Sequence, residues 1–106
     1  MEVRSIPETI GFSEEKMKKN ALFDSRHLFY DVYCLLPGQS QKVHAHEGSD
    51  KVYYVVHGAG RFTVGEEERD LGEGEAVIAR AGTSHGVRNE TQENLVVLVA
   101  MAPRPS

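Results

Sequence analysis

The sequence predicts an all-β fold, a barrel or a sandwich, on two observations. From residue 21 onward, short runs of apolar, β-branched and aromatic residues follow a period of two, which is the period of a strand. Clusters rich in glycine, asparagine and acidic residues separate these runs at nearly regular intervals. Strands do not alternate with long helical patterns, so a parallel α/β sheet is not expected.

The 106 residues are expected to form one domain, 1–106, which is long enough to bury a core without disulfide bonds. Residues 1–20 are expected to form an N-terminal strand and a short helical arm, and residues 21–102 the barrel. Residues 2–6 read as a short edge strand that ends at Pro7, which cannot donate to a ladder. Residues 13–19 read as a helix of at most about two turns, with Ser13 as its cap and lysines at its end.

The barrel strands are predicted where the alternating runs fall. The predicted strands span residues 27–36, 42–46, 51–56, 61–64, 69–71, 76–79, 86–89 and 95–101. Pro37 and Gly38 end the first of them, and Gly58, Gly74 and Gly82 are predicted turn positions with unusual backbone angles.

The last predicted strand, residues 95–101, is apolar on both faces. A strand with one face in water would alternate apolar and polar residues, so something must cover its outer face. The short N-terminal helix or a second subunit are the two covers that the sequence offers.

Composition excludes several classes of partner. The net charge is −4 and the basic residues are scattered, so no nucleic-acid partner is expected. No apolar run approaches the ~18 residues of a membrane span, and the first five residues lack the apolar core of a signal peptide, so no membrane is expected either. A single cysteine, Cys34, excludes an internal disulfide and indicates a cytoplasmic location, with the thiol as a small buried apolar group.

Three of the five histidines have the spacing of a metal site. His44 and His46 are one residue apart in a predicted strand, so their side chains share a face. His85 follows a turn signal at the start of another strand. Three imidazoles suit a divalent ion, namely Zn, Fe, Mn, Ni, Co or Cu, and the ligand type does not choose among them. The alternative is that the histidines are polar lining without a metal.

The histidines belong to two blocks of fixed spacing. The first block reads Gly38, five residues, His44-Ala45-His46, four residues, Lys51, six residues and Gly58. The second reads Gly74, five residues, Arg80, one residue, Gly82, two residues, His85, three residues and Asn89. Together the blocks resemble the paired motifs of the cupin superfamily, in the order and separation of small single-domain cupins. The resemblance implies a double-stranded β-helix, or jelly-roll barrel, a metal held by the histidines, an Asn89 that tethers backbone, and a homodimer.

The chain departs from the family pattern at two positions, because Lys51 stands where the family usually has Glu and Arg80 where it usually has Pro. A cation about 4 Å from a divalent ion would cost roughly 8 kcal/mol at an effective dielectric constant near 20, so Lys51 is not an ordinary ammonium touching the metal. It is either neutral, turned outward to a carboxylate such as Glu47 or Asp50, bound to an anionic substrate, or at the rim with its head in water. In a shifted register Asp50 would be the fourth ligand.

The remaining site residues follow from strand parity and from the resemblance. Lys51, Tyr53 and Arg80 are the candidate residues of a substrate pocket, and no residue is assigned as a catalytic acid or base. The resemblance implies a metal-dependent enzyme of the dioxygenase, isomerase or lyase type that acts on a small organic molecule. The alternative is a module that binds or senses a small-molecule ligand without turnover, because the fold by itself does not determine the reaction.

Overall fold

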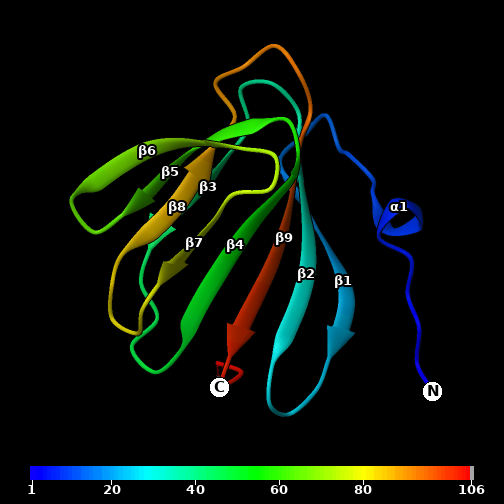
Figure 1. Cartoon of the computed structure of the whole chain (residues 1–106), viewed down its shortest axis with the longest axis vertical. Coiled ribbons are helices and arrows are strands. Elements are labelled where there is room, and N and C mark those ends of the chain that lie inside the picture. Colours follow the sequence, from blue (N-terminus) through cyan, green and yellow to red (C-terminus); the bar gives the residue numbers. More distant parts are fainter. Residues whose placement is uncertain (106) are drawn as a thin grey trace.

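Two antiparallel sheets face each other in the computed structural model, which describes residues 1–105 (Figure 1). The larger sheet has the order β1-β2-β9-β4-β7, and the smaller has the order β3-β8-β5-β6. The elements are α1 (Ile6–Thr9), β1 (Lys18–Asp24), β2 (Phe29–Leu35), β3 (Ser40–His44), β4 (Asp50–His57), β5 (Ala59–Val64), β6 (Glu67–Gly72), β7 (Ala76–Ala79), β8 (His85–Arg88) and β9 (Leu95–Ala102). This confirms the predicted all-β, double-sheet jelly roll with one short helix.

The eight predicted strands correspond to β2 through β9, with bounds that differ by at most two residues. The three glycines predicted at turns adopt the unusual backbone angles expected of them. Gly58, Gly74 and Gly82 have φ values of 83°, 85° and 84°. Gly58 is the tightest of these turns. A Cβ atom there would lie 2.4 Å from the carbonyl oxygen of Asn94, so only glycine fits the turn between β4 and β5.

The N-terminal arm differs from its prediction. Residues 2–6 form no strand, and the helix lies over Ile6–Thr9 instead of residues 13–19. Ser5 caps this helix by accepting a hydrogen bond from the backbone N–H of Glu8 at 3.4 Å. Pro7 lies in its first turn, where a missing N–H costs nothing, so Pro7 marks a helix start and not a strand end.

Residues 14–16 form a bend, and β1 begins at Lys18, within the predicted helix. Two turns of helix do not repay the cost of nucleation without an apolar face to bury, whereas β1 gains a ladder of pairs along β2. This unpredicted strand places Lys19 opposite Tyr33.

The core lies between the sheets and consists of the inward side chains of both. Tyr33, Tyr53 and Val97 are among its buried members. A second cluster covers one end of the outer face of the larger sheet, where Val96 packs with Leu22 beneath apolar residues of the arm. The arm residues in this cluster are Ile6, Ile10 and Phe12. The arm thus covers only part of the outer face of the larger sheet. Two of its three covering residues, Ile10 and Phe12, lie outside the helix.

Asn89 ties three chain segments together, as the resemblance implied. Its side-chain amide donates to the carbonyl oxygens of Leu35 at 3.0 Å and Glu93 at 2.8 Å. Its carboxamide oxygen accepts from the backbone N–H of Thr91 at 3.0 Å. Because Asn89 is buried, these bonds replace the water that its amide would otherwise bind.

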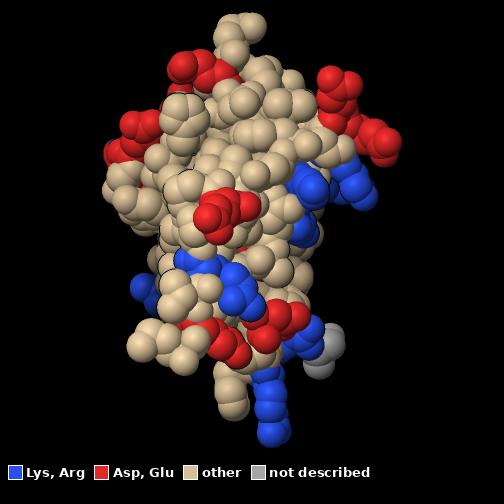
Figure 2. Space-filling view, turned by 90° about the vertical axis from the view of Figure 1, so that its right-hand side faces the viewer, with Lys and Arg blue, Asp and Glu red and all other residues tan. Residues whose placement is uncertain are grey.

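Charged side chains of both signs are interspersed on the face that carries the N-terminal arm (Figure 2). Over the part of the chain that the structure describes, no helix has the length and apolar composition to cross a membrane.

Candidate metal centre

Three imidazoles converge at one end of the space between the sheets. His44 is the last residue of β3, His46 lies in the loop that follows, and His85 opens β8. Ring centroids are 4.8 Å apart for His44–His46 and for His44–His85, and 5.6 Å apart for His46–His85. One nitrogen from each ring lies within 4.8 Å of the others, so a single ion can lie against all three. The structure therefore brings together the three histidines that the sequence singled out.

A β-bulge aims His44 at His85. Gln41 pairs with Val87 and His44 pairs with His85, so β3 advances three residues while β8 advances two. Residues three apart in a regular strand point to opposite faces, yet Gln41 is buried in the core and His44 faces His85. The extra residue in β3 restores the inward direction.

Gly86 makes room for this bulge. A Cβ atom at Gly86 would lie 2.9 Å from the carbonyl oxygen of Gln41 and 3.2 Å from the Cα atom of Val43, both backbone atoms that cannot rotate away. Sequence reasoning did not select Gly86. Its signal was a glycine inside a strand, directly after a candidate ligand, which often marks a close backbone approach.

Backbone carbonyls fix which nitrogen of two imidazoles is free. The Nδ1 atom of His85 lies 2.9 Å from the carbonyl oxygen of Thr83, and that of His44 lies 2.7 Å from the carbonyl oxygen of Lys42. A carbonyl can only accept, so each Nδ1 carries the proton and each Nε2 presents a lone pair. The Nε2 atom of His85 is buried and has no hydrogen-bond partner among the described residues.

Burial and nearby charges favour the neutral form of two of the imidazoles, which is the form that binds a metal. Burial lowers the pKa of His85, and the charge of Lys51 lowers it further, against a raising effect of the bond to Thr83. Burial, followed by His44 and Lys51, also lowers the pKa of His46. The lowered pKa values of His46 and His85, the two carbonyl-oriented rings of His44 and His85, and the unpartnered buried Nε2 of His85 together fit a divalent metal ion.

Lys51 points into the cavity and is 1% exposed. Its Nζ atom lies 5.0 Å from the ring centroid of Tyr33 and 5.1 Å from that of Tyr53. Within residues 1–105, no side chain or carbonyl forms a hydrogen bond or an ion pair with this ammonium, and burial lowers the pKa of Lys51 to about 7. The outward and rim placements are therefore wrong, and the inward one is correct.

Asp50 and Arg80 lie outside the cluster. Asp50 is exposed, and its carboxylate accepts a hydrogen bond from the backbone N–H of Ala81 at 2.8 Å. Asp50 precedes Lys51 in β4 and so faces the other way, which rules out the shifted register with Asp50 as a fourth ligand. Arg80 is also exposed and does not line the cavity.

Tyr53 is a core residue next to the cavity and does not line it. Its side chain is fully buried, its hydroxyl donates to Oε1 of Gln41 at 2.7 Å, and its ring centroid lies 6.2 Å from that of His85. The Nε2 group of Gln41 in turn donates to the hydroxyl of Tyr33 at 3.3 Å. Tyr53 therefore fixes the positions of its neighbours more than it offers a group to a ligand.

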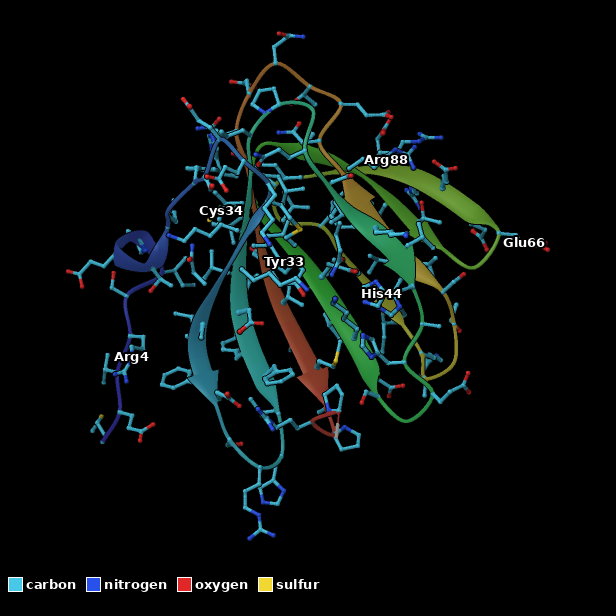
Figure 3. The ribbon with its side chains drawn as sticks, turned by 180° about the vertical axis from the view of Figure 1, so that it is seen from behind. Arg4, Tyr33, Cys34, His44, Glu66 and Arg88 are labelled. Carbon is cyan, nitrogen blue, oxygen red and sulfur yellow. The ribbon has the colours of Figure 1, made fainter. Side chains whose placement is uncertain are left out.

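The cavity beside the histidines has a volume of about 330 Å³, near the lower end of small-molecule sites. The polar residues that line it are Lys19, Asp31, Tyr33, His44, His46 and Lys51. Tyr33 and His44 approach it from facing sheets (Figure 3). Sequence reasoning missed Lys19, Asp31 and Tyr33. The available signal was parity, because Asp31 is a charged residue on the face of β2 that also carries Tyr33 and Leu35.

Comparisons with known proteins agree with this architecture. A family model described as "Cupin domain" matches residues 31–101. A crystal structure of a protein from Thermus thermophilus is 50% identical, covers 99% of this chain and 100% of its own, and has a TM-score of 0.97. An uncharacterized protein of Streptomyces coelicolor is 37% identical over 76% of this chain and 75% of its own. The oxalate-binding protein of Thermotoga maritima is 28% identical over 80% of this chain and 69% of its own.

Proposed function

Because the chain belongs to the cupin family, we propose that it binds one first-row divalent metal ion through His44, His46 and His85 and uses it to convert a small organic molecule. The buried Nε2 atom of His85 carries this proposal. A buried polar atom without a partner costs about 1–3 kcal/mol, and a metal bond at that lone pair removes the cost.

The ligand count supports an enzyme over a closed structural site. Three histidines would hold the ion, while Asp50 faces away and Lys51 stands at the position of the family's acid, so no carboxylate within residues 1–105 joins the cluster. Catalytic metal sites keep positions open in this way, whereas structural zinc sites are closed by four protein ligands. A bound ion would supply Lewis-acid polarisation of a substrate oxygen at the open positions. Dioxygenase, isomerase and lyase chemistry are the reaction types proposed for it.

A module that binds or senses a small ligand without turnover is the second candidate. It is favoured by the relative from Thermotoga maritima, which is named for binding oxalate. Oxygen uptake, together with loss of the NMR signals of added organic acids, would separate an enzyme from such a module.

The metal proposal is tested by elemental analysis of protein purified without an affinity tag. After incubation with Zn, Fe, Mn, Ni, Co and Cu salts and dialysis, we expect about one ion per chain, since the three nitrogens form one site. Protein that retains no first-row metal after this treatment would show that the histidines are polar lining.

We further propose a homodimer that covers the open part of the larger sheet's outer face. Val52, Tyr54 and Ile78 are 37%, 41% and 38% exposed there, and Val52 and Tyr54 line an apolar groove with Leu98 and Ala100. Light scattering at micromolar concentration is expected to give twice the monomer mass, and Tyr54→Glu to give the monomer mass, because it places a charge in the groove. A monomeric wild-type protein would contradict the proposal.

A cytoplasmic location is also proposed. Its support is the single thiol, Cys34, which is fully buried and whose pKa is raised by burial, so it remains a neutral thiol that needs no pairing.

A further inference from the structure

The amine of Lys51 is buried and has no hydrogen-bond or ion-pair partner among residues 1–105. Its side chain is 1% exposed, and its Nζ atom lies over the rings of Tyr33 and Tyr53, 5.0 Å and 5.1 Å from their centroids. Aromatic faces attract a cation but do not accept the three hydrogen bonds that an ammonium offers. A charged side chain is almost never buried without a partner, yet no described residue gives the ammonium of Lys51 a hydrogen bond or an ion pair.

Burial and the charge of Lys19 lower the pKa of Lys51 and the charge of Asp31 raises it, but no described group forms an ion pair with Lys51. Lys19 lies on the same aromatic ring, with its Nζ atom 5.3 Å from the centroid of Tyr33, and adds a second positive charge. Asp31 is the one carboxylate among the polar lining residues, and it forms no ion pair with either lysine among the described residues. Burial, the largest effect on it, raises the pKa of Asp31. A divalent ion on the histidines would add further positive charge beside this cavity.

Tyr33 offers a second donor in the same cavity. Its hydroxyl oxygen accepts a hydrogen bond from Gln41, but its own proton has no acceptor within residues 1–105. Burial and the charge of Asp31 raise the pKa of Tyr33, so the hydroxyl keeps this proton. An ammonium and a phenol proton that both lack an acceptor therefore line one cavity of about 330 Å³.

We propose that Lys51, assisted by Tyr33, binds the carboxylate of a small organic acid beside the metal site. This inference deepens the proposed function and rests on it for the position of the metal, but the anion-binding group is Lys51 itself. A carboxylate fits better than a phosphate or sulfate, because the cavity has no arginine fork, and its other walls include Phe29 and Met101, which suit a carbon skeleton.

The test compares propionate with propionamide, which has nearly the same shape and no charge. Binding is measured by NMR chemical-shift titration of wild type, Lys51→Met and Lys18→Met, each in metal-loaded and in chelator-treated form. Methionine keeps the length and apolar stem of lysine but not the charge. Lys18 is the matched control, since it is exposed, neighbours Lys19 in β1 and does not line this cavity.

Wild type and Lys18→Met are expected to bind propionate at least about tenfold more tightly than Lys51→Met does. All three proteins are expected to bind propionamide only weakly. Equal propionate affinities for wild type and Lys51→Met would overturn the inference, as would equal affinities of wild type for the acid and the amide.

Comparing the metal-loaded with the chelator-treated protein distinguishes a failure of this inference from a failure of the metal proposal. If no metal binds but propionate binding still depends on Lys51, the anion site stands and the metal proposal fails. If one ion binds per chain and Lys51→Met binds propionate as wild type does, the metal proposal stands and the anion site fails.

Discussion

Replacing His85 with alanine is expected to lower the affinity for a divalent metal by at least about 100-fold, or about 2.7 kcal/mol. His85 is the most buried of the three histidines, and its proton is held on Nδ1 by Thr83, so its Nε2 is already oriented as a ligand. Alanine removes one of three protein ligands and leaves a space that water can fill only as a weaker ligand. A metal titration followed by calorimetry measures the change.

His57→Ala is the matched control for this experiment. His57 is exposed at the end of β4, and its Nδ1 atom lies 3.1 Å from a carboxylate oxygen of Glu73, away from the cluster. This variant should bind the metal as wild type does. An unchanged affinity in His85→Ala would mean that the three histidines are not the metal ligands, even though the fold is right.

Replacing Lys51 with methionine is expected to stabilise the metal-free protein by roughly 4 kcal/mol near neutral pH. The pKa of Lys51 falls from its ordinary value of 10.5 to about 7 because burial disfavours the ammonium. Each unit of pKa shift corresponds to about 1.4 kcal/mol, and methionine fills similar space without a charge. Urea unfolding of both proteins in the presence of a chelator measures the difference.

The lowered pKa of Lys51 also makes the free energy of unfolding of wild type depend on pH. Between about pH 7 and pH 10.5 the unfolded chain holds a proton on Lys51 that the folded chain has released. The free energy of unfolding of wild type therefore rises with pH through this window, and the advantage of Lys51→Met shrinks as it does. The titratable groups that line the cavity with Lys51 are Lys19, Asp31, Tyr33, His44 and His46, and Tyr53 and His85 lie near it outside that lining.

Lys18→Met again serves as the control, since an exposed lysine should change neither the stability nor its pH dependence by more than about 0.5 kcal/mol. A Lys51→Met protein with the stability and pH profile of wild type would show that the ammonium reaches water. A destabilising buried cation that persists in the sequence fits a group kept for binding, in line with the carboxylate site proposed above.

The sequence by itself determined the fold class and the three candidate ligands. Strand period and turn residues are local properties, so runs such as residues 76–79 were located without any knowledge of their partners. The helical arm was the exception. Ser13 and the charges after it satisfy helix rules locally, but pairing of β1 with β2 outweighed that weak preference.

Only the tertiary structure decided how the site is assembled. The direction of His44 depends on a bulge in β3, and the bulge depends on Gly86 in the neighbouring strand, so neither follows from the spacing of the histidines. Likewise, the spacing left open whether Lys51 points into the cavity, outward or to the rim, and its lack of an ion-pair partner among the described residues depends on which side chains of β1 and β2 lie beside it. Those contacts join residues far apart in the chain, and no local pattern records them.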